Sequence, residues 1–313
     1  MFTSFLLPLA LAAAAPAPSE IVAQAPATDW RAIPADEIMV MDLAPDAAGR
    51  PRRVVIQLMP APFSQGWIGN IRRLTAAHWW DGTAVTRVQD NYVAQWGDAS
   101  GAKPFPPGLS AVPARDYETA LGRTFVADGT VRQAGSRDFV GRVVTEGRDA
   151  YAPLTFIWHG WPIAAEQGPQ GTMAWPAHCY GMVGVGREMP PDTGNGAELY
   201  AVTGHAPRHL DRNMAVVGRV IEGIEHLSAL PRGTEALGVY ATTAERVPIV
   251  SMRMADELPP AERPRFEYLA SESGSFARYA DARANRRDPF FIRPSGGADI
   301  CNVPVPVRRA GKP

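Results

Sequence analysis

The pattern of apolar and polar residues predicts a chain built mainly from short strands. Apolar stretches of strand rather than helix length recur between turn residues. They cover residues 37–43, 52–60, 83–89, 92–98, 181–186, 198–204, 214–221 and 247–254. The first two flank turn residues and are expected to form a hairpin. Asp81-Gly82 and Asp90-Asn91 are turn signals on either side of the third strand.

Helical spacing is confined to a few places. Trp67, Ile71, Leu74 and His78 fall on one face of a helix expected over residues 63–78, with Ser64 as its N-cap. A shorter amphipathic helix is expected over residues 222–230, and another over about 273–287. The chain shows no alternation of strand and helix. This order predicts a closed antiparallel barrel with a helix at each open end.

The two ends of the chain differ from this pattern. Residues 2–15 are mostly apolar and precede small residues, as in a secretory signal peptide, although no Lys or Arg comes before them. We therefore expect a signal peptide over residues 1–25, a linker over 26–36, a main domain over 37–258 and an extension over 259–313. The alternative for the N-terminus is an uncleaved anchor. Cleavage implies a periplasmic or secreted protein.

A long insertion, at about residues 99–180, interrupts the main domain. It is rich in Gly and Pro and is expected to be irregular. Its apolar cluster of Phe156, Trp158 and Trp161 is expected to pack on the barrel. The alternative is a surface that binds client proteins.

Composition supports a folded protein. Hydrophobic residues make up 46% of the chain and charged residues 20%, enough for a core. The formal net charge is −1 without long runs of like charge, so we expect neither nucleic acid as a partner nor stable membrane insertion once the signal is removed. Cys179 and Cys301 could form a disulfide in an oxidising compartment, and the alternative is two buried thiols.

Two segments resemble the signature of the cyclophilin family. In residues 70–98 the residues that match are Asn70, Leu74, Trp80, Asp81, Gly82, Arg87, Gln95, Gly97 and Asp98. Residues 198–227 resemble the family's Ser-Gln-Phe-Phe strand, its Trp-Leu-Asp loop and its Phe-Gly-x-Val strand–helix junction. The segments occur in the family's order, and the resemblance extends over about residues 38–254 apart from the insertion.

The resemblance implies an eight-stranded antiparallel barrel with two capping helices, and a peptidyl-prolyl cis-trans isomerase that needs no metal or cofactor. Rotation about an Xaa-Pro amide has a barrier of about 18–20 kcal/mol, and the enzyme must bind the twisted amide better than either planar isomer. Arg87 would be the catalytic donor to the prolyl nitrogen, because a guanidinium is always charged and rigid. Gln95 would bind the substrate backbone and orient Arg87.

The resemblance also identifies a substrate-binding set. The matching residues are Tyr92, Val93, Gly186, Arg187, Tyr200, His209, Leu210 and Met214. Several of them depart from the family's pattern: His209 replaces a loop Trp and Met214 a pocket-edge His. Thr86 likewise replaces the His that precedes the catalytic Arg. The altered rim predicts weak binding of cyclosporin-like macrocycles.

Two functions follow as hypotheses. The first is an isomerase that acts on proline-containing polypeptides and assists the folding of exported proteins. The alternative is a cyclophilin-like binding module or chaperone with little catalysis, whose client binding depends on the insertion rather than on Arg87.

Overall fold

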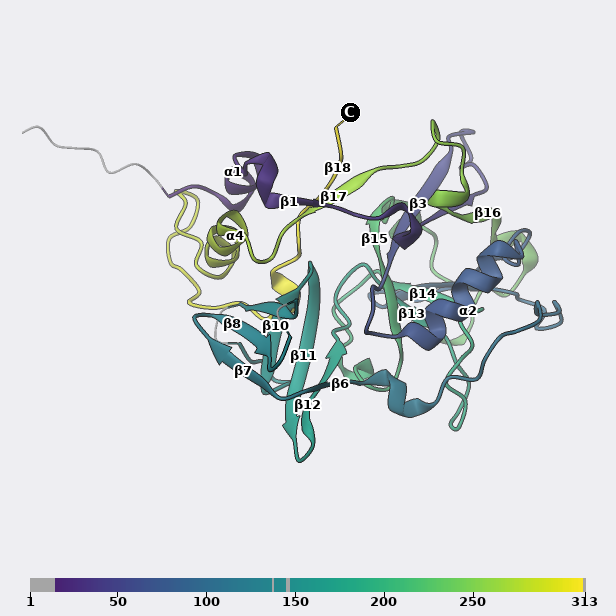
Figure 1. Ribbon diagram of the computed structural model, residues 1–313. Helices are drawn as coiled ribbons and strands as arrows, with labels where there is room; N and C mark the ends of the chain where they lie inside the picture. Colours follow the sequence, from purple (N-terminus) through teal and green to yellow (C-terminus); the bar gives the residue numbers. More distant parts are fainter. Residues whose placement is uncertain (1–14, 137, 145–146, 312–313) are drawn as a thin grey trace, which may run out of the picture.

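The computed structural model describes residues 15–136, 138–144 and 147–311. It contains a closed barrel, whose strands lie in the right-hand half of Figure 1. The barrel strands are β2 (Ile38–Leu43), β3 (Arg52–Leu58), β4 (Ala84–Val88), β5 (Val93–Gly97), β13 (Met182–Val185), β14 (Leu199–Val202), β15 (Val216–Glu222) and β16 (Val247–Met254). They follow one another in the order β13-β14-β5-β4-β16-β2-β3-β15, each antiparallel to its neighbours. The predicted eight-stranded antiparallel barrel is confirmed.

Alternation along the strands explains which side chains fill the barrel. Met39 and Met41 on β2 are fully buried in the main core, together with Ile56 on β3. The residues between them point to the other face of the sheet, as the strand period of two requires. There Val40 and Val55 pack with Phe266 of the C-terminal extension. The extension therefore covers part of the outer barrel surface.

The helices differ in detail from their expected form. α2 (Gln65–Ala76) buries Trp67, as predicted, but Ser64 is not a side-chain cap: its φ is 57° and its Oγ donates to the Val216 carbonyl at 2.7 Å. α3 (Glu225–Ser228) is a single turn and shorter than expected. The reason is that β15 runs on to Glu222, after which Gly223 adopts a φ of 83° that breaks the backbone pattern.

The insertion is not irregular, contrary to expectation. It forms a seven-stranded sheet in the order β6-β12-β11-β10-β9-β8-β7. The strands are β6 (Thr119–Gly122), β7 (Thr124–Ala127), β8 (Thr130–Gln133), β9 (Val140–Val143), β10 (Leu154–Trp158), β11 (Trp161–Gly168) and β12 (Gly171–Pro176). Its glycines mark hairpin turns: His159-Gly160 and Asp128-Gly129 each have two positive φ angles.

The aromatic cluster of the insertion packs inward. Phe156, Trp158 and Trp161 are all buried, and Trp158 makes an edge-on contact with Phe63 at 5.4 Å between ring centroids. The packing interpretation is confirmed, and the three residues do not form an exposed surface. Figure 1 shows the insertion sheet beside the barrel.

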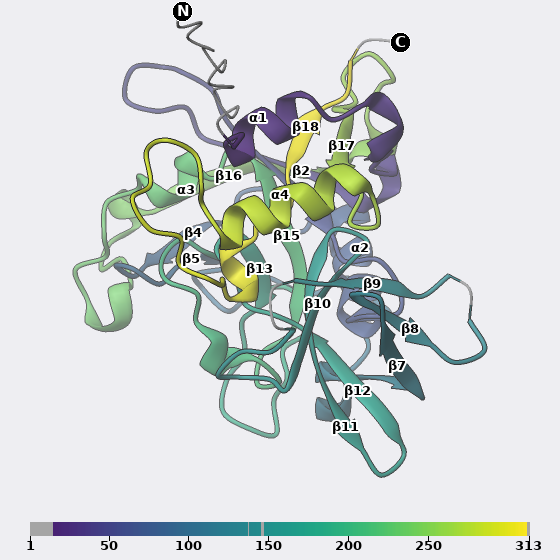
Figure 2. The same ribbon diagram turned by 90° about the vertical axis from the view of Figure 1, so that its left-hand side faces the viewer.

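The two ends of the chain form a third unit. β1 (Trp30–Ala32) and β18 (Val307–Arg309) both pair with β17 (Phe266–Leu269). α1 (Pro18–Ala23) contacts α4 (Gly274–Ala284), beside which it lies in Figure 2.

These contacts correct the expectation of a plain linker over residues 26–36, because β1 is an integral strand. Most of the predicted signal peptide, residues 1–14, lies outside the described residues. Within the described part of the chain, no helix has the length and apolar character needed to cross a membrane.

A disulfide joins the extension to the barrel domain. Cys179 and Cys301 are bonded, with 122 residues of sequence separation. Of the two alternatives that the sequence left open, the disulfide is therefore confirmed and the pair of buried free thiols is wrong. Cys179 lies between the insertion sheet and β13, and Cys301 lies in the C-terminal extension. The bond therefore holds three parts of the fold together.

Candidate active site

Arg87 is held in place by neutral oxygen atoms. It lies on β4 directly opposite Gln95 on β5. Its Nη1 donates to Gln95 Oε1 at 3.0 Å, its Nε donates to the Leu237 carbonyl at 2.7 Å, and its Nη2 donates to Gln89 Oε1. None of these partners is a carboxylate. Burial lowers the pKa of Arg87 below its ordinary value, but a guanidinium remains charged at neutral pH.

Gln95 links Arg87 to a carboxylate. Its Nε2 donates to Glu198 Oε2 at 3.2 Å, so its Oε1 is oriented toward Arg87. Burial raises the pKa of Glu198. The sequence did not identify Glu198 or Gln89 as site residues. The available signal for Glu198 was its place in the Ser-Gln-Phe-Phe block, where the family has Gln.

The apolar residues predicted to hold a proline ring form one cluster. Val93 and Tyr200, on the neighbouring strands β5 and β14, are buried in it, and the partly exposed Tyr92, Leu210 and Met214 pack against them.

This cluster lies next to the arginine. The Tyr92 ring centroid is 5.8 Å from Arg87 Cζ, and the same ring stacks on His209 at 6.3 Å. The cluster thus presents aromatic and aliphatic surface next to the fixed guanidinium.

The remaining predicted residues line an adjoining depression of about 590 Å³. Gly186 and Arg187 contribute to it together with Gln95 and Glu198. A Cβ at Gly186 would come within 3.3 Å of Gln95 Nε2, so a larger residue there would crowd the Gln95 amide. The structure therefore brings all ten predicted catalytic and substrate-binding residues to one region, with Gln95 at the junction of its two halves.

A buried hydrogen-bond network adjoins the apolar cluster at Tyr200. The Tyr200 hydroxyl is 3.0 Å from His178 Nε2, and His178 Nδ1 is 2.9 Å from Asp211 Oδ1. Arg208 Nε donates to the other oxygen of Asp211 at 2.6 Å, and Arg208 Nη1 donates to Asp149 in the insertion at 2.5 Å. The network connects the insertion to the pocket.

Charges within the network fix the direction of its hydrogen bonds. Burial opposes ionisation of Asp211, but the hydrogen bond from His178 and the charge of Arg208 outweigh it, and the pKa of Asp211 is lowered. Ionised Asp211 accepts from His178 Nδ1, and in the neutral imidazole this leaves Nε2 to accept the Tyr200 O–H. Burial raises the pKa of Tyr200 well above its ordinary value, so its hydroxyl stays protonated. No sequence spacing pointed to His178 or Asp211.

The arrangement suits stabilisation of a twisted amide rather than bond cleavage. The three hydrogen bonds of Arg87 use three of the five N–H groups of a guanidinium. The other two are not used by these bonds and can donate to a substrate. A proline ring in the apolar cluster would place its nitrogen near this donor.

Comparison with known proteins bears on the family. The family model of cyclophilin-type peptidyl-prolyl cis-trans isomerases matches residues 52–254. Among solved structures, cyclophilin AquaCyp293 from Hirschia baltica is similar, with a TM-score of 0.66 and 22% identity over 90% of this chain and 95% of that chain. At this identity the likeness supports the fold alone.

Other comparisons add little. A cyclophilin-type peptidyl-prolyl cis-trans isomerase from Cryptosporidium parvum aligns over 71% of this chain and 99% of its own, at 12% identity, but its TM-score of 0.38 is too low to support an argument. A comparison with curated proteins found no match. The family model nevertheless spans more than half of the chain. The chain therefore belongs to the cyclophilin family and is a peptidyl-prolyl cis-trans isomerase.

Proposed function

We propose that this isomerase acts on Xaa-Pro bonds of exported proteins and that Arg87 is its catalytic residue. The observation that carries the assignment is the Arg87 guanidinium, which has no carboxylate partner among the described residues and is aligned by Gln95 beside an apolar cluster. An oriented positive charge without an ionic partner, next to an apolar cluster, fits the demands of the reaction.

The proposed mechanism is differential binding. The proline ring lies among Tyr92, Val93, Tyr200, Leu210 and Met214, which anchor one side of the amide. As the amide twists, its nitrogen loses conjugation and becomes a hydrogen-bond acceptor, to which Arg87 donates. The donor favours the twisted state over both planar isomers, which lowers the barrier of about 18–20 kcal/mol without making or breaking a bond.

Two observations support action outside the cytosol. Residues 2–15 have the composition of a signal peptide core. The Cys179–Cys301 disulfide is of a kind that persists in oxidising compartments. We place signal cleavage before Pro18, because α1 packs on α4 and buries Ile21. Intact-mass analysis of the mature protein from a periplasmic fraction tests this position, and a mature chain that begins after Ala25 would contradict it.

The role of Arg87 is tested with a protease-coupled isomerisation assay on a panel of Xaa-Pro peptides. Removing one donor aimed at a transition state lowers kcat by about 100- to 1000-fold, and we expect Arg87→Ala to fall in this range. Arg53→Ala is the matched control, since Arg53 is an arginine of β3 that pairs with Asp42 on the barrel surface. Full activity of a folded Arg87→Ala enzyme would overturn the assignment. A folded wild type that is inactive on every peptide would favour the binding-module alternative.

A further inference from the structure

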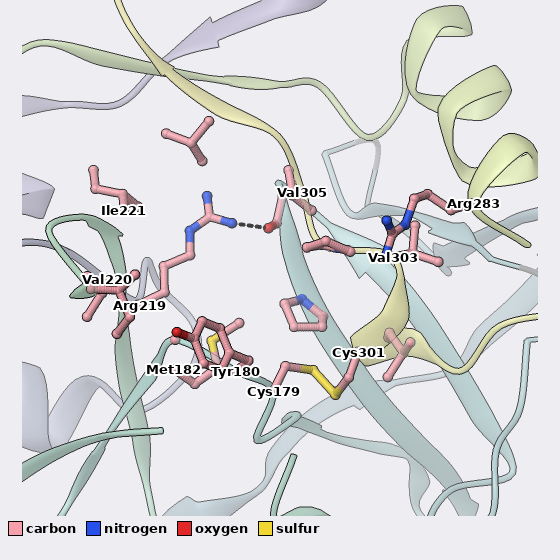
Figure 3. Close-up of a pocket in the computed structure, with 17 residues that line it drawn as sticks. Cys179, Tyr180, Met182, Arg219, Val220, Ile221, Arg283, Cys301, Val303 and Val305 are labelled. Carbon is pink, nitrogen blue, oxygen red and sulfur yellow. Dashed lines mark hydrogen bonds between the residues drawn. A yellow bond between two sulfur atoms is a disulfide. The ribbon is translucent and has the colours of Figure 1, made fainter. Parts of the chain in front are cut away.

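A second cavity lies where the added segments cover the barrel (Figure 3). It has a volume of about 360 Å³ and contains none of the predicted catalytic or substrate-binding residues. Volumes of about 300–1,000 Å³ are typical of small-molecule sites. Its walls come from β15 of the barrel, from the segment that leads into β13, from the β10–β11 turn of the insertion and from the C-terminal extension. Much of the lining is aliphatic: Met182, Ile221, Ile224, Ile300, Val303 and Val305.

Arg219 extends into this cavity from β15, toward the segment that carries Val303 and Val305 (Figure 3). The residue is 6% exposed. Its Nε and Nη2 donate to Gln57 Oε1 at 3.0 and 2.8 Å, and its Nη1 donates to the Gly160 carbonyl at 2.6 Å. Nη1 and Nη2 therefore each retain one N–H group that none of these three bonds uses.

The charge of Arg219 is not neutralised by a direct partner. Within the described part of the chain, no carboxylate forms an ion pair with it; Glu37 instead accepts from the Nε2 of the intervening Gln57 at 3.1 Å. Burial lowers the pKa of Arg219 to about 10. A buried charge without an ionic partner is costly, so an anion in the cavity would be stabilising.

A second arginine adds to this positive charge. Arg283 of α4 also lines the cavity, and its Nε donates to the Asn302 carbonyl at 2.9 Å. Among the described residues, the lining thus includes two arginines and no Asp or Glu. Aliphatic walls with positive charge alone are complementary to a molecule that has an apolar body and an anionic head.

We propose that this cavity binds a small aliphatic carboxylate. The carboxylate pairs with the free N–H groups of Arg219, since guanidinium and carboxylate are complementary in shape and charge. The alkyl chain lies against the isoleucine and valine side chains of β15 and the extension. The site is separate from the proposed isomerase site and does not depend on the role of Arg87.

Octanoate is the probe for this site, measured by isothermal titration calorimetry on the mature protein. We expect octanoate to bind and 1-octanol, which has the same chain without the charge, to bind at least ten-fold more weakly. Arg219→Gln should raise the Kd for octanoate at least ten-fold, whereas the surface control Arg53→Gln should leave it unchanged. Isomerase activity of Arg219→Gln should remain within two-fold of wild type.

A second variant keeps the test decisive if Arg219→Gln fails to fold. Val305 is a partly exposed residue of the cavity wall, and Val305→Phe should fill the cavity while Arg219 stays intact. It should abolish octanoate binding. Absence of octanoate binding to wild type at millimolar concentration would overturn the proposal. So would equal affinity for octanol, or unchanged binding in Val305→Phe.

Discussion

Two arginines of the barrel, Arg87 and Arg219, have the same local design and different surroundings. Each lies opposite a glutamine on the neighbouring strand, Gln95 for Arg87 and Gln57 for Arg219, and donates to its Oε1. In each case the glutamine Nε2 donates in turn to a glutamate, Glu198 or Glu37. Burial lowers the pKa of both arginines.

The difference lies in what covers them. Arg87 is half-buried, beside side chains that match the family's proline pocket. Arg219 lies under the insertion and the C-terminal extension. Its Cζ is 4.6 Å from the centroid of the Trp161 ring. An oriented guanidinium is therefore not sufficient to define an isomerase site. An isomerase site must also be accessible to a polypeptide. The insertion and the C-terminal extension cover Arg219, so a polypeptide cannot reach it.

The largest expected effect concerns the Cys179–Cys301 disulfide, which holds the C-terminal extension over the barrel. Replacing Cys179 and Cys301 by Ser removes a cross-link over 122 residues. Loss of a native disulfide typically costs about 2–5 kcal/mol, with longer loops at the upper end. Urea unfolding should show a decrease in this range, and octanoate binding should weaken more than isomerase activity. An equal loss of both functions would contradict the separation of the two regions.

A smaller effect is expected where the insertion is hydrogen-bonded to Tyr200 of the apolar cluster. Tyr200→Phe removes the hydroxyl that is hydrogen-bonded to His178 Nε2. This buried nitrogen is then left without its partner. Such an atom costs about 1–3 kcal/mol. Urea unfolding should show this loss in the wild-type background. In an Asp211→Asn background, where the network is already disturbed, the loss from Tyr200→Phe should be smaller. Equal losses in the two backgrounds would show that Tyr200 and Asp211 are not coupled through the network.

The same network predicts acid sensitivity. The folded-state pKa of Asp211 is lowered, so its contribution to stability is present above the unfolded-state pKa of about 3.9 and is lost as the pH falls through the lower folded value. Unfolding free energies measured between pH 6 and pH 3 should decline toward acid. In Asp211→Asn the decline should be shallower, and an identical slope would contradict this role for Asp211.

The smallest effects concern Glu37 and Glu198, the two glutamates that accept hydrogen bonds from Gln57 and Gln95. Burial raises the pKa of both Glu37 and Glu198, so each charged carboxylate is unfavourable in the folded state at neutral pH. Glu37→Gln and Glu198→Gln should each raise the Tm slightly at pH 7. The gain should disappear below about pH 4, where the wild-type glutamates are protonated in both states. A lower Tm at pH 7 would indicate that these charges stabilise the arginines.

The barrel and the candidate active site could be predicted because their signals are local. Arg87 and Gln95 are eight residues apart within one hairpin, and the apolar stretches of the strands are continuous in sequence. Arg219 and Gln57 are 162 residues apart, and Arg219 is buried by segments that have no counterpart in the resemblance. Its setting could not be inferred from neighbouring residues.

The insertion and the segment 26–36 differ from expectation for similar physical reasons. The insertion was expected to be irregular because its many glycines suggest loops, yet they form the hairpin turns of a sheet. The linker over residues 26–36 was expected because the segment is short and rich in Ala and Pro. Its strand β1 exists only through pairing with β17, more than two hundred residues later.

The central claim is that Arg87 acts on the bound amide, whereas Arg219 does not. NMR exchange spectroscopy on a saturating Xaa-Pro peptide measures the rate of isomerisation on the enzyme and, by titration, the affinity. The account predicts that Arg87→Ala slows the bound exchange by about 100-fold or more while the peptide Kd changes little, and that Arg219→Gln changes neither. Normal exchange in Arg87→Ala, or an equal loss in Arg219→Gln, would contradict it.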